Sequence, residues 1–466
     1  MVARWLLLAA ACIAIAVAVT AVRPRTTPGP PSRDFEAYWA AGATWNDRGD
    51  PYGRAIWNAE RRVAGVDARW NETLPFIGPP HTLPAWSLTA RLPYERAVPI
   101  WWSVLGVALL TLVATSLLAA GTPLGVPAFA GGLVLAVSFA PVSSDLALGQ
   151  IALPAFAGAL LVVVLAQPSW IAAAFAVPLA FAQPNVALGL ASQLGRNRTT
   201  LAIAAGAAVT YGIGAYAYGW TWPIGYARAL VEHRAAERFV AIQFDPASIA
   251  FALGAPRQAA VSIGMIAGLL AIAAATAVCV VVRDRFARFA AVSALVPFVA
   301  FFFHEHDFVV AFAAAIWCAV RTSGTTRVLA LVGTLLAGFD WLGLAQRPTG
   351  VAQSALLAAA AFAAFASLGE HVDLRRLVPV ALGFAAMVAS AAFLAAGHPV
   401  PIWPDALSGL QIPRAATIAT VWLAEQRASG LLAAVPAWGL LRCFSLLGCA
   451  LLACAIYRHS SSRQTA

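Results

Sequence analysis

Long apolar runs, separated by short polar breaks, make up most of this 466-residue chain. A helix of about 20 apolar residues is long enough to cross the hydrocarbon core of a bilayer. The pattern therefore predicts an all-α polytopic membrane protein with about 12 to 14 transmembrane segments. The continuous runs are 5–22, 97–120, 125–141, 148–166, 200–219, 258–282, 287–303, 307–321, 326–345, 351–369, 377–396 and 437–457.

The first run, 5–22, has the position of a secretory signal peptide. It is long for the apolar core of a signal, and its end, AVAVTAV, offers only a weak cleavage site. We expect an uncleaved first helix and treat 1–466 as a single integral membrane domain.

The stretch 170–195 differs from the other runs because Gln183 and Pro184 interrupt it. Proline lacks a backbone donor and breaks or kinks a helix. Each arm has about 12 residues, roughly 18 Å of helix, which is too short to cross the bilayer. We predict a broken helix pair that brings Gln183 to a polar cavity. Counted as two arms, the pair puts the N-terminus and four arginine-bearing loops on the cytoplasmic side, as the positive-inside rule requires. These loops are 195–198, 283–288, 321–327 and 373–376.

The long polar segments then share the opposite, extracytoplasmic face. The cytoplasmic loops are short, so most side chains capable of chemistry lie on one side of the membrane. We expect an inner-membrane protein whose site faces outward, in loops that carry short amphipathic helices. The polar segments are 23–96, 220–257, 304–306 and 397–436.

Composition narrows the classes of partner. The chain is 61% hydrophobic and 11% charged, with a formal net charge of +10, and every basic residue other than histidine is arginine. The arginines are scattered over many loops instead of forming one basic patch, which argues against nucleic acid. Arginines that set the topology of the loops or contact anionic lipid headgroups explain the excess of positive charge, so membrane lipids are the expected partners.

The segment 33–57 has helical periodicity, with Asp34, Tyr38 and Trp45 on one stripe. It predicts an amphipathic helix along the membrane interface that ends near the DRGDPYG sequence. Asp34 falls in the first turn, where it could cap the helix or act as a functional carboxylate. Glu36 lies on another face, where we expect it to be solvated.

The FFFHEHDFVV sequence puts four ionisable residues, 304–307, between two apolar runs. Ionisable groups near membrane depth are costly and mark functional sites. A solvated hairpin and a metal site are alternatives, but one such cluster is a weak metal signal, and we expect no metal. Histidine forms charge-assisted hydrogen bonds with phosphate, which we favour as the ligand.

A series of short motifs spans 34–307. They are Asp34-Phe35, Tyr38-Trp39, Ala41-Gly42, Gly49, Pro51-Tyr52, Pro79-Pro80, Leu148-Gly149-Gln150, Gln183-Pro184 and the 304–307 cluster. In this order they resemble glycosyltransferase family 87, the polyprenyl-phosphate-sugar-dependent mannosyltransferases of the C-type (GT-C) membrane superfamily. Compared with that family, Trp39 and Gly42 replace a commoner tyrosine and alanine, Gln183 replaces a commoner lysine, and the last third of the chain matches no motif.

The resemblance implies a GT-C-like bundle that moves a hexose, most commonly mannose, from a polyprenyl-phosphate sugar to a hydroxyl of a lipid or glycan acceptor. It gives Asp34 the role of general base, with an oxocarbenium-like transition state. The lipid-phosphate sugar is a co-substrate, and we expect no cofactor. We assign substrate binding to Arg33, Tyr38, Gln150, Gln183, His304, His306 and Asp307.

Two other functions are compatible with the sequence. A transporter or lipid-linked-sugar flippase could use the broken helix at Gln183-Pro184 as its gate. No corresponding break appears in the other half of the chain, and the long outer loops have no evident use in a carrier. A transferase of arabinose or of a whole lipid-linked glycan would keep the same fold.

Overall fold

The computed structural model describes residues 2–20, 32–63, 74–195, 197–300, 302–369, 374–402 and 416–463. Within these ranges every regular element is a helix. Parts of the predicted polar loops, at 21–31, 64–73 and 403–415, lie outside the described residues.

Six helices are long and apolar enough to cross a membrane, or seven spans if a bent pair counts as one. Their outer surfaces carry large apolar side chains, such as Leu269 (68% exposed) and Phe393 (85% exposed). Apolar side chains that point outward from long helices are suited to lipid contact. The chain is therefore an all-α, multi-pass membrane protein. The six helices are α5 (Tyr94–Ala119), α11 (Asn197–Tyr218), α14 (Arg257–Val281), α19 (Val351–Leu368), α20 (Leu374–Gly397) and α22 (Pro436–Ser462).

Shorter helices complete the bundle. The first helix packs against α19, α17 packs against α22, and α8 packs against both α5 and α9. These helices are α1 (Val2–Thr20), α6 (Val126–Ser138), α7 (Ala140–Leu148), α8 (Ala152–Leu165), α9 (Trp170–Ala180), α10 (Pro184–Ala187), α13 (Pro246–Ala252), α15 (Arg285–Leu295), α16 (Phe312–Arg321), α17 (Gly324–Gly338) and α18 (Trp341–Gln346). Short 3₁₀ helices are η2 (Pro80–Thr82), η3 (Leu188–Gln193), η4 (Val296–Phe298), η5 (His306–Ala311) and η6 (Pro348–Gly350).

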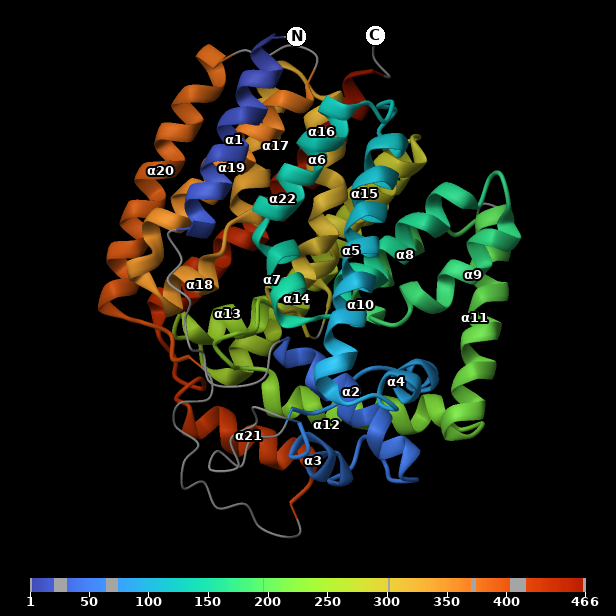
Figure 1. The fold of residues 1–466 in the computed structure, drawn as a ribbon. Helices are drawn as coiled ribbons and strands as arrows, with labels where there is room; N and C mark the ends of the chain where they lie inside the picture. Colours follow the sequence, from blue (N-terminus) through green and yellow to red (C-terminus); the bar gives the residue numbers. More distant parts are fainter. Residues whose placement is uncertain are drawn as a thin grey trace.

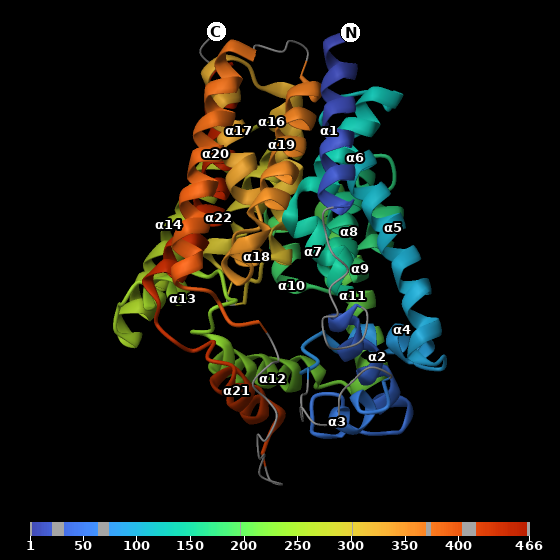
Figure 2. The same ribbon diagram turned by 60° about the vertical axis from the view of Figure 1, so that its left-hand side comes forward.

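A layer of short helices covers one end of the bundle, and both chain ends lie at the other end (Figures 1 and 2). The first polar segment and the segments around 230 and 420 meet in this layer, although they are far apart in the sequence. Its helices are α2 (Arg33–Asn46), α3 (Ala55–Glu60), α4 (Leu83–Thr89), α12 (Trp222–Glu237) and α21 (Ile418–Ala428).

Arginine side chains hold loops together at the end that carries the termini. An Arg4 guanidinium nitrogen donates to the Gly369 carbonyl at 2.5 Å, and Arg321 Nε donates to the Ala120 carbonyl at 2.6 Å. The N-terminal helix and the loop after α16 are thus at the same end as the C-terminus (Figure 1). The contacts thus place the N-terminal helix and one of the four predicted arginine-bearing loops, 321–327, at the same end.

The predicted helix break at Gln183-Pro184 is present, because α9 ends at Ala180 and α10 begins at Pro184. Further breaks were not predicted. The run 125–141 is not one continuous span, since α6 and α7 meet at Phe139 with a bend of 70°. The run 326–345 is divided between α17 and α18, and in the run 287–303 α15 ends at Leu295. Pro141 lies in the first turn of α7, and its missing N–H prevents α6 from continuing.

Candidate functional site

Aromatic side chains of α5 fix the start of α2. Ser32, directly before this helix, has a left-handed backbone with φ of 53°. The Tyr94 hydroxyl donates to the Ser32 carbonyl at 3.0 Å, and the Trp102 indole donates to the Ser32 hydroxyl at 2.6 Å. The first turn of α2, which contains Asp34, is thereby attached to a long helix of the bundle.

The Asp34 carboxylate bonds to a side chain from a distant part of the sequence. Gln150 Nε2 donates to Asp34 Oδ2 at 2.6 Å, and the Tyr38 hydroxyl donates to Gln150 Oε1 at 2.6 Å. Burial, and next the Asp34 charge, raise the pKa of Tyr38, so its phenol keeps the proton that it donates. Ser32 occupies the N-cap position, so the alternative that Asp34 caps the helix is wrong.

Gly149 explains how Gln150 reaches Asp34. Its φ is 76°, and a Cβ at this position would meet Ser32 Cβ at 2.8 Å and Phe35 Cβ at 2.9 Å. Only glycine adopts this conformation at low cost and lets the end of α7 approach the start of α2 so closely. This steric requirement explains why the Leu148-Gly149-Gln150 motif has glycine at its central position.

The 304–307 cluster meets the broken helix at Asp307. Gln183 Nε2 donates to Asp307 Oδ1 at 3.2 Å, and the backbone N–H of His304 donates to Asp307 Oδ2 at 2.9 Å. Asp307 has no exposed surface, so the solvated hairpin is wrong for this residue. The residue that interrupts the helix therefore holds the carboxylate that shapes the His304 loop.

A buried network surrounds the His304 imidazole. His304 Nε2 lies 3.5 Å from Glu237 Oε2, and the other Glu237 oxygen, Oε1, lies 3.2 Å from His233 Nε2. Gln243 Nε2 donates to Glu237 Oε2 at 2.7 Å, and the Trp422 indole donates to Glu237 Oε1 at 2.5 Å. The carboxylate of Glu237 thus joins α12, α21 and the His304 loop.

Charges decide the protonation of this network. Burial alone would lower the pKa of His304, but the hydrogen bond and charge of Glu237, followed by Asp307 and Asp34, raise it to about 9. Burial alone would raise the pKa of Glu237, but His233 and His304 lower it below its ordinary value. The raised pKa favours the protonated form of His304, and the charge of Asp34 contributes to that shift.

Asp145 is a residue that the sequence analysis missed. It has no exposed surface. The Leu153 backbone stabilises its carboxylate, and it interacts electrostatically with Asp34, Tyr38 and Asp307. An acidic residue inside the apolar stretch 125–166 was the available signal.

The other predicted site residues, His306 and Arg33, lie at the edge of the network formed around Asp34 and His304. The His306 ring stacks on the His304 ring with centroids 5.4 Å apart, whereas Arg33 lies near Tyr94. Glu36 is 3% exposed, so the expectation that it is solvated is wrong. The reason is that α2 packs against α4 and α5, which brings Glu36 close to Tyr94.

The network partners Glu237 and Trp422 were also missed. The i, i+4 spacing of His233 and Glu237 on a helix was a usable signal for one of them. Nothing in the sequence around Trp422 indicated its role. Among the described residues, no group of three or more His, Cys, Asp or Glu side chains could hold a metal ion.

Comparisons of the chain with protein-family models, curated proteins and solved structures found no match. The resemblance to glycosyltransferase family 87 therefore stays a prediction that rests on the motifs quoted above. The site itself combines the Asp34 carboxylate, the His304 imidazole and three further carboxylates that are buried, those of Asp145, Glu237 and Asp307.

Proposed function

We propose that the chain is a membrane glycosyltransferase that moves a hexose from a polyprenyl-phosphate-linked donor to a hydroxyl of a lipid or glycan acceptor. Two ordered groups carry the proposal: the Asp34 carboxylate, held by Gln150 at 2.6 Å, and the His304 imidazole, held 3.5 Å from the Glu237 carboxylate. The charge of Asp34 also acts on His304. Such a transfer needs a base for the attacking hydroxyl and a cation for the phosphate that leaves. These two residues supply one of each.

Asp34 is the general base in this proposal. The acceptor oxygen bonds to the anomeric carbon of the donor while the bond from that carbon to the phosphate oxygen breaks. The hydroxyl proton passes to Asp34, and the lipid phosphate leaves with the bonding electrons. The sugar is oxocarbenium-like in the transition state. The hydrogen bond from Gln150, at 2.6 Å, orients the carboxylate for this transfer.

His304 stabilises the lipid phosphate, which gains negative charge as it leaves. A charge-assisted hydrogen bond is stronger than a neutral one, and a group that is already positioned needs no reorganisation during the reaction. Glu237 keeps the imidazole protonated, and Asp307 positions its backbone. Gln183 contacts Asp307, so it supports the phosphate site indirectly.

An adjoining cavity of ≈ 610 Å³ offers room for the lipid part of the donor. It lies between the α6–α7 bend, α17, α18 and α19, and its lining mixes apolar residues such as Leu335 with polar ones such as Arg347 and Asp340. Asp340 interacts electrostatically with Glu305, the residue that follows His304. An isoprenoid phosphate needs this combination of apolar and polar surface next to the reacting centre.

We further propose that the bundle is GT-C-like, with 12 to 14 segments when its shorter helices are counted, and that it lies in the plasma membrane. The layer of short helices would then face the extracytoplasmic side. The arginine contacts at the opposite end support this orientation, because cytoplasmic loops are rich in arginine.

The test is sugar transfer by the purified protein in lipid nanodiscs, with a panel of polyprenyl-phosphate sugars and detection of glycolipid products by mass spectrometry. Loss of a general base typically costs about 10²- to 10⁴-fold in rate, so Asp34→Asn is expected to lose transfer by that factor. Asp47→Asn is the matched control, because Asp47 lies just after the other end of α2 and its side chain is 63% exposed.

Transfer that survives Asp34→Asn at the wild-type rate would remove Asp34 from the mechanism. Movement of a lipid-linked sugar between leaflets, without a new glycosidic bond and unaffected by Asp34→Asn, would support the flippase instead.

A further inference from the structure

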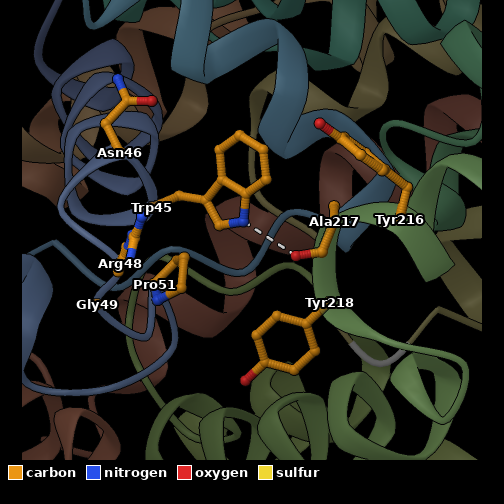
Figure 3. A pocket seen from close by; sticks show the side chains of 8 residues that line it. All are labelled: Trp45, Asn46, Arg48, Gly49, Pro51, Tyr216, Ala217 and Tyr218. Atoms are coloured by element: carbon orange, nitrogen blue, oxygen red, sulfur yellow. Dashed lines mark hydrogen bonds between the residues drawn. The ribbon is translucent and has the colours of Figure 1, made fainter.

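A second cavity, of ≈ 530 Å³, lies at the opposite end of α2 from Asp34. We call it the aromatic cavity, because Trp45, Tyr216 and Tyr218 line it together with Asn46 and Arg48 (Figure 3). The Trp45 indole donates to the backbone carbonyl of Ala217 at 2.9 Å, which fixes the ring against the end of α11. The cavity thus lies between the end of α2 and the end of α11.

The Trp45 and Tyr216 rings form two walls that meet at an interplanar angle of 65°, with centroids 6.4 Å apart. The Tyr218 hydroxyl donates to Asp50 Oδ1 at 2.8 Å and places a further polar group near the opening. Tyr216 is 78% exposed, so most of its ring can accept a ligand. Apolar ring faces beside a few fixed polar groups are typical of sites for small polar molecules with an apolar face.

Arg48 follows the end of α2 and lines the cavity. Its φ is 59°, and its N–H bonds to the Trp45 carbonyl at 3.0 Å, the usual geometry at a helix end, where glycine is favoured. The arginine at this position adds guanidinium donors to the lining of the cavity.

The combination of ring faces and hydrogen-bonding groups matches the chemistry of a sugar ring, which has C–H faces and a rim of hydroxyls. We propose that the aromatic cavity binds a sugar unit of the acceptor glycan, remote from the unit that is modified. This inference rests on the proposed function, because it names the acceptor class of the same enzyme. From Asp34 to Trp45, α2 rises by roughly 17 Å, a distance that requires an acceptor of several sugars.

The test measures binding and transfer separately. Wild-type protein and variants in nanodiscs are titrated by calorimetry with soluble mannose and glucose oligosaccharides of one to five units, and the same oligosaccharides on a short lipid are used as transfer acceptors. The variants are Tyr216→Ala and Arg48→Gly. Trp220→Ala is the control, because Trp220 is 75% exposed near the same helix end and is not among the residues that line the cavity.

Wild-type protein is expected to bind longer oligosaccharides of one series more tightly. Tyr216→Ala and Arg48→Gly each weaken that binding by about tenfold, while Trp220→Ala does not. Both variants raise KM for long acceptors and leave transfer to single-sugar acceptors unchanged. Arg48→Gly relieves the strained backbone, so its melting temperature should not fall, which separates lost binding from unfolding.

Asp34→Asn is expected to bind oligosaccharides as the wild type does, so a failed glycosyltransferase assignment is distinguishable from a failed binding site. The proposal is overturned if the wild type binds neither series. It is also overturned if both cavity variants bind oligosaccharides like the wild type. The same holds if the difference between the variants and the wild type depends only on the lipid headgroups of the nanodisc and not on the oligosaccharide.

Discussion

The Trp422 indole donates a hydrogen bond to Glu237 Oε1, while Glu237 Oε2 lies 3.5 Å from His304 Nε2. A residue of the last third of the chain, where no motif was found, thereby acts on the histidine at the centre of the candidate site. Glu237 has the decisive position, since its charge is what keeps the His304 imidazole protonated.

The first prediction concerns pH dependence. The pKa of His304 is raised to about 9, so its cation is present below that value and is lost as the pH rises through it. Transfer, measured as kcat/KM, should therefore fall as the pH rises through about 9. Glu237→Gln removes the charge that raises the pKa, so the same fall should occur at a lower pH. Glu232→Gln, on the exposed face of α12, is the control and should leave the profile unchanged. Identical profiles for all three proteins would contradict this role of Glu237.

The second prediction concerns the Tyr38–Gln150–Asp34 chain of hydrogen bonds. Gln150→Leu removes a hydrogen bond to a charged group, worth about 1.5–3 kcal/mol, so kcat should fall by roughly 10- to 150-fold. Tyr38→Phe leaves the bond to Asp34 intact and removes a neutral one, so the loss should be about fivefold. Steady-state kinetics should show these losses in kcat more than in KM. A larger effect for Tyr38→Phe would reverse the assigned order of importance.

A third prediction compares two glycines. Gly149→Ala forces a non-glycine residue to φ of 76° and adds a Cβ within 2.8 Å of Ser32 Cβ, so it should destabilise the fold by at least about 1–2 kcal/mol and reduce transfer. Gly106→Ala, inside α5, adds a Cβ with nothing within 4 Å and should stabilise by about 0.5–1 kcal/mol. Thermal unfolding in detergent measures both, and equal shifts would contradict the steric argument.

The fourth prediction tests Asp145. Its carboxylate is fully buried, and burial of a charge is costly, so Asp145→Asn should keep or raise the melting temperature. Transfer should fall, because the carboxylate interacts electrostatically with Asp34 and Asp307. Asp284→Ala is a control for which the reverse result is expected, a loss of stability with unchanged transfer. It removes the N-cap of α15, which accepts from the Ala287 N–H at 2.6 Å, and should cost about 1 kcal/mol of stability. Wild-type transfer by Asp145→Asn would leave this carboxylate without a role.

The fold class was predictable because apolar length and proline position act locally. The interruption at Pro184 follows from the chemistry of one residue, and the structure has it there. The bend at Phe139 was missed because Pro141 lies near the end of an apolar run, where composition alone still indicates a continuous helix.

The partners within the site were less predictable, because hydrogen bonds between distant segments leave no periodic pattern. Asp34 and Gln150 stood out individually, but only the approach permitted by Gly149 brings them together. Gly42 is similar: in place of the commoner alanine it allows α2 to contact the backbone of Trp86 in α4, which a Cβ would obstruct. Such steric requirements emerge only when two helices are packed.

The span of sequence that the site uses has a consequence for biogenesis. Its parts come from Asp34, from the segment around Glu237, and from Trp422 much later in the sequence. The ribosome must therefore deliver α21 to the membrane before the contact between Trp422 and Glu237 can close. In the proposed mechanism, a nascent chain arrested before α21 would lack the contact that holds Glu237 and is expected to be inactive.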